Sequence, residues 1–154
     1  MKLAEALLLR GDLQRVLASL RERIGKNTLV QEDERPSEDP AALLASAEAV
    51  IRRLQKVTFA INEANLAART AKGRPLTLVL AERDAILQRH GLLKTAASSA
   101  TQQPERYGTK EIRWVRTIDV EAIQQSADEA AIAYREVNAE IQAANWTVEL
   151  TAAL

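Results

Sequence analysis

Two arginines and two asparagines have the types and spacing that suggest a shared polar site. Arg10 and Arg83 occupy inward positions of apolar helical repeats, where a charge is costly unless it is paired. Asn65 and Asn145 lie about as far from the ends of the second and fourth predicted helices as Arg10 and Arg83 lie from the starts of the first and third. In antiparallel hairpins, we therefore expect Arg10 to contact Asn65 and Arg83 to contact Asn145. The set has two interpretations: a buried polar layer that fixes helix register, or a site where two guanidinium and two amide groups hold a small anion.

A second group mixes cations with aromatic rings within a single predicted loop. Such mixtures are typical of proteins that bind single-stranded nucleic acids. The alternative is a solvated loop that pairs with the acidic loop at 27–38. Balanced charge, 21 Lys plus Arg against 21 Asp plus Glu, argues against a nucleic-acid-binding protein. The residues of this possible interaction loop are Arg106, Tyr107, Lys110, Arg113, Trp114 and Arg116.

Other reactive groups are scarce. The chain has no Cys and a single His, His90, which lies on an apolar helix stripe and is expected to be a core or edge residue. The sequence contains neither a Gly-rich phosphate loop nor a nucleophile elbow. We therefore expect no catalytic residues, no metal site, no cofactor and no enzymatic activity.

Four long helices must position these residues. Apolar residues recur every three or four positions through 3–24, 40–68, 76–97 and 120–144, the period of an amphipathic helix. Asp39 and Asp119 stand where N-caps are expected. The sequence predicts an all-α, antiparallel four-helix bundle.

The helices form an internal repeat. A shift of 73 positions lays Leu3 on Leu76, and a shift of 80 lays Asp39 on Asp119. This predicts one domain, 1–154, made of two pseudo-equivalent hairpins, about 2–71 and about 76–150. Because β-branched residues occur near 27–32 and 111–118, we also expect a short two-stranded β ribbon between the long loops.

The N-terminus does not look like an export signal. Glu5 interrupts the apolar run, and Arg10 to Asp12 closes it early, so we expect the first helix of a cytoplasmic protein. The apolar runs are also too short to cross a bilayer.

The chain resembles the septicolysin-like family of small bacterial proteins along essentially its whole length. The most specific parts of the likeness are the block Ile-Arg-Trp-Val-Arg-Thr-Ile-Asp-Val at 112–120 and the closing Asn-Trp-Thr at 145–147; segments 3–7 and 62–65 add to it. The resemblance implies a haemolysin or pore-forming activity.

Three functions follow from these observations. The first is a non-enzymatic homo-oligomer without membrane binding, because small residues cover several faces of 120–144 and the two long loops carry opposite charge. The second is the membrane-active, pore-forming toxin that the resemblance implies. The third is a module that binds a small anion or nucleic acid.

Overall fold

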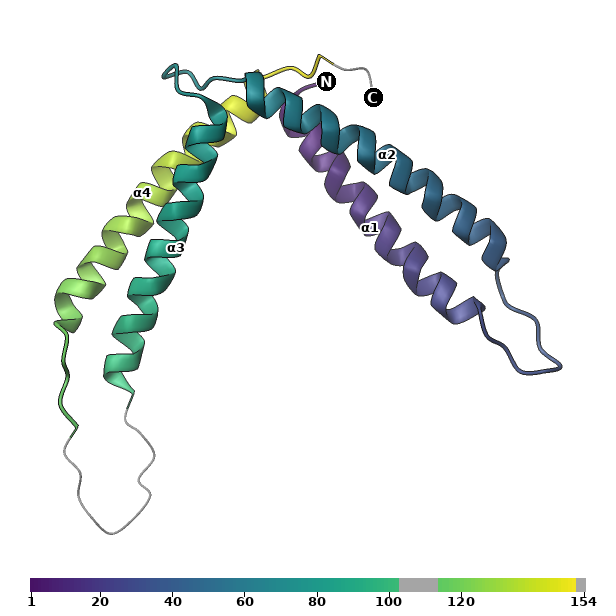
Figure 1. Ribbon diagram of the computed structural model, residues 1–154, viewed down its shortest axis with the longest axis horizontal. Coiled ribbons are helices and arrows are strands. Elements are labelled where there is room, and N and C mark those ends of the chain that lie inside the picture. Colours follow the sequence, from purple (N-terminus) through teal and green to yellow (C-terminus); the bar gives the residue numbers. More distant parts are fainter. Residues whose placement is uncertain (103–113, 152–154) are drawn as a thin grey trace, which may run out of the picture. The chain divides into compact units, whose positions relative to one another are not determined.

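The protein is all-α in the computed structural model, which describes residues 1–102 and 114–151. Its helices are α1 (Leu3–Asn27), α2 (Pro40–Ala67), α3 (Leu76–Thr101) and α4 (Val120–Thr147). They form two antiparallel helical hairpins, α1 with α2 and α3 with α4 (Figure 1). The predicted fold class, four helices and two hairpins, is confirmed, and each helix ends within four residues of its predicted limit.

The α1–α2 hairpin is held by a stripe of aliphatic side chains. Leu20 of α1 packs with Leu43 and Ala47 of α2, and all three are buried. Leu17, Ile24 and Val50 extend this cluster. The apolar positions that set the helical period in the sequence are thus the ones that join the two helices.

The second hairpin buries several alanines beside larger aliphatic residues. Ala97 of α3 and both Ala127 and Ala130 of α4 are buried, as is Val137. Alanines at these positions let the two helix backbones approach closely. Val79 of α3 and Ile141 of α4 are buried as well, so the second hairpin combines alanines with larger aliphatic side chains.

Both predicted N-caps are present. The Asp39 carboxylate accepts a hydrogen bond from the Ala41 backbone N–H at 3.0 Å, and Pro40 follows at the first helical position. The Asp119 carboxylate accepts one from the Ala122 N–H at 3.1 Å. The cap pair predicted from the 80-residue shift thus performs the same task in both hairpins.

The repeat extends to two backbone junctions that the sequence analysis did not foresee. The Leu76 N–H donates to the Ala68 carbonyl at 3.0 Å, and the Leu3 N–H donates to the Val148 carbonyl at 2.9 Å. Shifts of 73 and 80 positions convert one of these bonds into the other. The same shifts relate the two antiparallel β-bridges, Arg69 with Pro75 and Lys2 with Glu149.

The expected β ribbon is not formed by the described residues. Asn27 ends α1, and the N–H of Thr28 still donates to the Ile24 carbonyl, as in a helix. Residues 28–32 and 114–118 contain no strand, while 111–113 lie outside the described residues. The prediction is therefore wrong for the described part, because the helix keeps its hydrogen bonding through residue 28 and the loop that follows folds onto the Asn27 side chain.

The chain divides into two compact units whose limits differ from those of the hairpins. The first comprises Met1–Leu76 with Gln142–Leu154, and the second comprises Thr77–Ile141. The C-terminal segment joins the first unit through the bonds to residues 1–3. Whether the chain behaves as one domain stays a prediction.

Candidate functional site

The predicted polar layer is distributed over both units. Arg10 and Asn65 are half-buried in the first unit, and Asn145 is buried there. No hydrogen bond joins Arg10 to Asn65 in the part of the chain that the structure describes. Arg83 belongs to the second unit, and its guanidinium donates to the adjacent Asp84 carboxylate at 2.7 and 3.0 Å. The layer, as a register device or an anion site, stays a prediction.

Only the end of the predicted interaction loop is described. Arg106, Tyr107, Lys110 and Arg113 lie outside the described residues. Trp114 is 70% exposed, and Arg116 is exposed as well.

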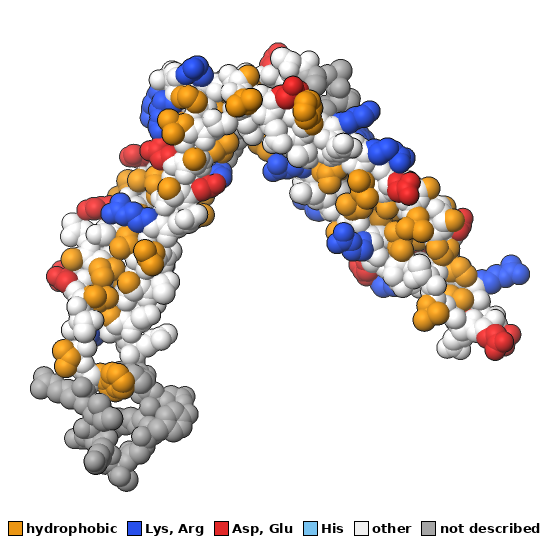
Figure 2. All heavy atoms as spheres, in the orientation of Figure 1, with side chains coloured by type: hydrophobic (Ala, Val, Ile, Leu, Met, Phe, Trp, Pro, Cys, Tyr) orange, Lys and Arg blue, Asp and Glu red, His pale blue; other side chains and the backbone are white. Residues whose placement is uncertain are grey.

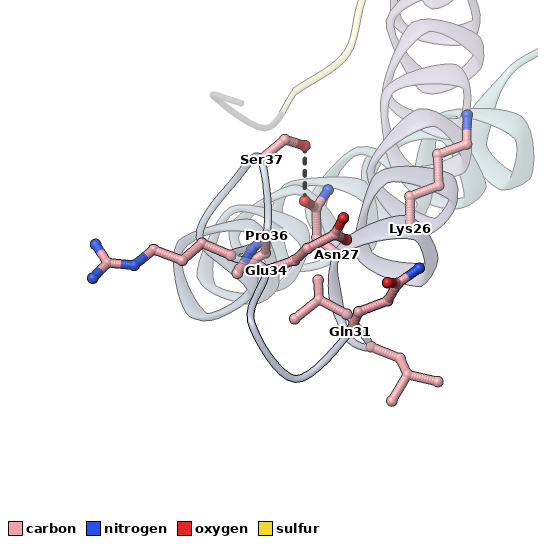
Figure 3. Close-up of a pocket in the computed structure, with 9 residues that line it drawn as sticks. Lys26, Asn27, Gln31, Glu34, Pro36 and Ser37 are labelled. Carbon is pink, nitrogen blue, oxygen red and sulfur yellow. Dashed lines mark hydrogen bonds between the residues drawn. The ribbon is translucent and has the colours of Figure 1, made fainter.

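The tip of the first hairpin is organised by Asn27, a residue that the sequence analysis missed. Its side chain is buried and makes three hydrogen bonds: the amide donates to the Arg23 carbonyl at 2.9 Å, and the amide oxygen accepts from the Ser37 hydroxyl at 2.9 Å and from the Glu38 N–H at 3.0 Å. The Ser37 bond spans the loop (Figure 3). An Asn at a helix end is a recognisable C-terminal signal, but these partners arise only when the loop returns.

An ion pair closes the same loop. The Arg23 guanidinium donates to both carboxylate oxygens of Glu38, through Nε at 2.9 Å and through Nη2. This bidentate pair joins the last turns of α1 to the residue before the α2 cap. The hydrogen bond from Arg23 holds the pKa of the Glu38 carboxyl below its usual value, and the Arg23 charge lowers it further.

The loop encloses an open depression of about 510 Å³. Its wall combines aliphatic side chains with both signs of charge, and its central Asn27 is already hydrogen-bonded. The arrangement explains a rigid loop and provides no group poised for a reaction. The lining residues are Lys26, Asn27, Leu29, Val30, Gln31, Glu34, Arg35, Pro36 and Ser37.

His90 lies in a groove of about 340 Å³ between α3 and α4, where Lys94 and Asp128 also line the wall. It is half-buried, which agrees with the expected core or edge position. The nearby hydroxyls bond to their own helix: Ser98 donates to the Thr95 carbonyl at 3.0 Å, and Thr101 donates to that of Ser98 at 2.8 Å. These hydroxyls cap backbone carbonyls and are not arranged as a nucleophile with its base.

The described residues contain neither a candidate metal site nor a candidate membrane span. No group of three or more His, Asp or Glu side chains there could hold a metal ion. No helix in this part of the chain is both long and apolar enough to cross a membrane.

Among the described residues, α2 exposes a row of large hydrophobic side chains, which we call the α2 stripe. Leu44 is 49% exposed, Ile51 50%, Phe59 62% and Leu66 78%. At about 100° per residue, the four side chains fall within an arc of about 80°. Figure 2 shows hydrophobic side chains gathered along the α1–α2 hairpin. The sequence pattern does not single out this stripe, because α2 carries two apolar faces and the face toward α1 has the more continuous spacing.

The comparisons agree with this architecture. The chain is 34% identical to a functionally unknown conserved protein from Corynebacterium diphtheriae whose crystal structure is known, with a TM-score of 0.89 over 98% of this chain and 99% of that one. No curated protein matches the chain. Residues 10–150 match the model of a family of unknown function (DUF6847). The chain therefore belongs to this family.

Proposed function

We propose that the protein is a non-enzymatic, self-associating helical protein whose copies meet through the α2 stripe. The observation that carries the proposal is the exposure of four large hydrophobic side chains in register along a single helix. Single exposed hydrophobic residues are normal in folded proteins, but four large ones on one helix face, alternating with Glu48, Gln55 and Asn62, support a binding surface.

The stripe is separate from the face that builds the hairpin. Leu43, Ala47 and Val50 face α1, and they lie roughly 110° around the helix axis from the stripe. A helix that needed only one partner would carry a single apolar face. The second face of α2 is thus available for another helix without disturbing the first contact.

Association through apolar side chains and association through charged loops differ in their response to salt. The opposite charges of the two long loops also suit a contact between copies, and salt would weaken that contact because exposed charges are screened. Salt does not weaken an apolar contact, because burial of apolar surface is its main driving force. Light scattering on the eluted protein at low and high salt therefore separates the two modes.

The experiment compares the parent chain with two variants. We expect the parent to elute as a discrete oligomer at tens of micromolar, and Ile51→Lys to elute as a monomer, because a lysine in the stripe would have to be buried in the contact. Arg53→Ala, on the opposite side of α2, is the matched control and should associate like the parent. A parent that stays monomeric up to several hundred micromolar would disprove the proposal.

Membrane activity is the competing function, because the septicolysin-like resemblance implies it and an amphipathic helix can lie in a bilayer surface. If the parent stays monomeric in solution and still releases dye from liposomes at sub-micromolar concentration, membrane activity is favoured over self-association. We expect little release, since charges of both signs accompany the stripe.

A further inference from the structure

The spacing along the α2 stripe is symmetric. Leu44 and Ile51 are seven residues apart, Ile51 and Phe59 eight, and Phe59 and Leu66 seven. Gln55 is therefore eleven residues from both Leu44 and Leu66, and four residues from both Ile51 and Phe59. The stripe reads alike from either end.

We propose, building on the self-association proposed above, that a second copy binds α2 antiparallel, with a two-fold axis passing beside Gln55. In this register Leu44 of one copy lies opposite Leu66 of the other, and Ile51 lies opposite Phe59. One symmetric contact buries all four large side chains of both copies, which is the defining property of an isologous interface. A shift by one helical turn would leave at least one side chain of each copy without an apolar partner.

The polar residues of the stripe fit the same axis. Glu48 and Asn62 lie between the large side chains and are equally far from Gln55 in sequence, so the Asn62 amide of one copy can donate to the Glu48 carboxylate of the other. Arg52 already forms an ion pair with Glu48 at 3.6 Å within the helix. With Lys56 and Glu63 at the border, the surface carries two acidic and two basic residues, so the two copies meet without net repulsion.

The equivalent face of α4 does not carry this row of large side chains. The 80-residue shift maps the four stripe residues onto Gln124, Ala131, Ala139 and Trp146 of α4. Only Trp146 is large, and the symmetry of large side chains about the centre is lost. The repeat has thus diverged at this face, and we assign the contact between copies to α2 alone.

The contact is short, which sets the conditions of the test. Leu44 and Leu66 are about 33 Å apart along the helix at 1.5 Å per residue. An interface built on a single helix face is at the small end of specific interfaces, so we expect micromolar dissociation. Covalent capture at high protein concentration is therefore preferable to detection of a stable complex alone.

Single cysteines test the axis, because the natural chain has none. Gln55→Cys in the full chain should give a covalent dimer with a short bismaleimide, since the axis places this residue beside its own copy. Leu44→Cys and Leu66→Cys should each give no covalent dimer alone, and the two variants should form a mixed covalent dimer when they are combined. Arg53→Cys, on the far side of α2, is the control for random collision.

The outcomes separate this inference from the proposed function. Selective capture at Gln55→Cys and in the Leu44→Cys plus Leu66→Cys mixture supports the two-fold contact. If the parent is an oligomer in light scattering but Gln55→Cys gives no more covalent dimer than Arg53→Cys, the antiparallel register is overturned. Self-association is then still supported. A parent that is monomeric at all concentrations overturns both. Circular dichroism checks that each variant retains its helices.

Discussion

At the residue scale, Asn27 is the side chain that fixes the tip of the first hairpin. It satisfies a carbonyl of α1, a loop hydroxyl and the backbone N–H of Glu38 at once. Asn27→Ala should lower the free energy of unfolding by about 2 kcal/mol, because buried groups lose their partners. Chemical denaturation measures this change, and Gln31→Ala, an exposed residue of the same loop, should change it little. Equal effects of the two substitutions would contradict this role.

The Arg23–Glu38 pair gives the same loop a pH dependence. Because folding lowers the pKa of Glu38, the pair stabilises the folded state fully above the ordinary Glu pKa of about 4.3. That contribution is lost as the pH falls through the lower folded-state pKa. We expect urea titrations to show the parent more stable than Glu38→Gln at pH 7, with the difference shrinking as the pH falls below the ordinary Glu pKa and also shrinking in high salt. A difference that grows as the pH falls would have the wrong sign.

Residues differed in how far the sequence could predict them. Asp39 and Asp119 were predictable as N-caps, because a cap bonds to backbone only two or three residues away. Asn27 was not, because two of its three partners, Ser37 and Glu38, stand ten and eleven positions further along. Arg83 pairs with its neighbour Asp84, a local contact that the helix-to-helix argument overlooked.

At the element scale, two glycines illustrate opposite backbone roles. Gly73 has a φ of +77° in the turn before α3, whereas Gly91 lies inside α3 with open space around its Cα. Gly73→Ala should destabilise the protein by about 1 kcal/mol, because a Cβ is strained at positive φ. Gly91→Ala should stabilise it by about 1 kcal/mol, because alanine favours the helix. Thermal unfolding of both variants measures the two signs, and a stabilising Gly73→Ala would contradict the turn geometry.

The repeated junctions make a further prediction for the helices. Leu3 and Leu76 are equivalent under the 73-residue shift, and both are fully buried at the start of a helix. Each substitution by Ala should lower the free energy of unfolding by about 3 kcal/mol, through lost burial and the cavity left behind. Leu8→Ala, at an exposed position of α1, is the control. A small effect at one junction and a large one at the other would contradict their equivalence.

Helices were predictable because their signal is local and repeated. The three-and-four spacing of apolar residues located every helix, and the two sequence shifts anticipated the matched caps. The β ribbon failed because β-branched residues also occur in extended loops, and pairing depends on partners far away in sequence. The junction bonds between residues 3 and 148 escaped prediction for the same reason.

At the scale of the whole molecule, α2 has two apolar faces, and each is assigned to a different contact. One face joins α1 within the chain, and the other is the α2 stripe. The stripe was visible in the sequence as large residues at 44, 51, 59 and 66, but the structure was needed to show that α1 leaves them exposed. Membership of a family of unknown function leaves self-association as a property to be measured.

Sedimentation velocity of the full chain over a wide concentration range measures whether copies associate through the α2 stripe. We expect the average mass of the parent to rise with concentration above the 17.0 kDa of one chain, in low and high salt alike. Phe59→Lys should remain at 17.0 kDa, while Arg53→Ala should follow the parent. A parent that sediments as a single chain at every concentration, or a Phe59→Lys variant that associates as strongly as the parent, would contradict the account.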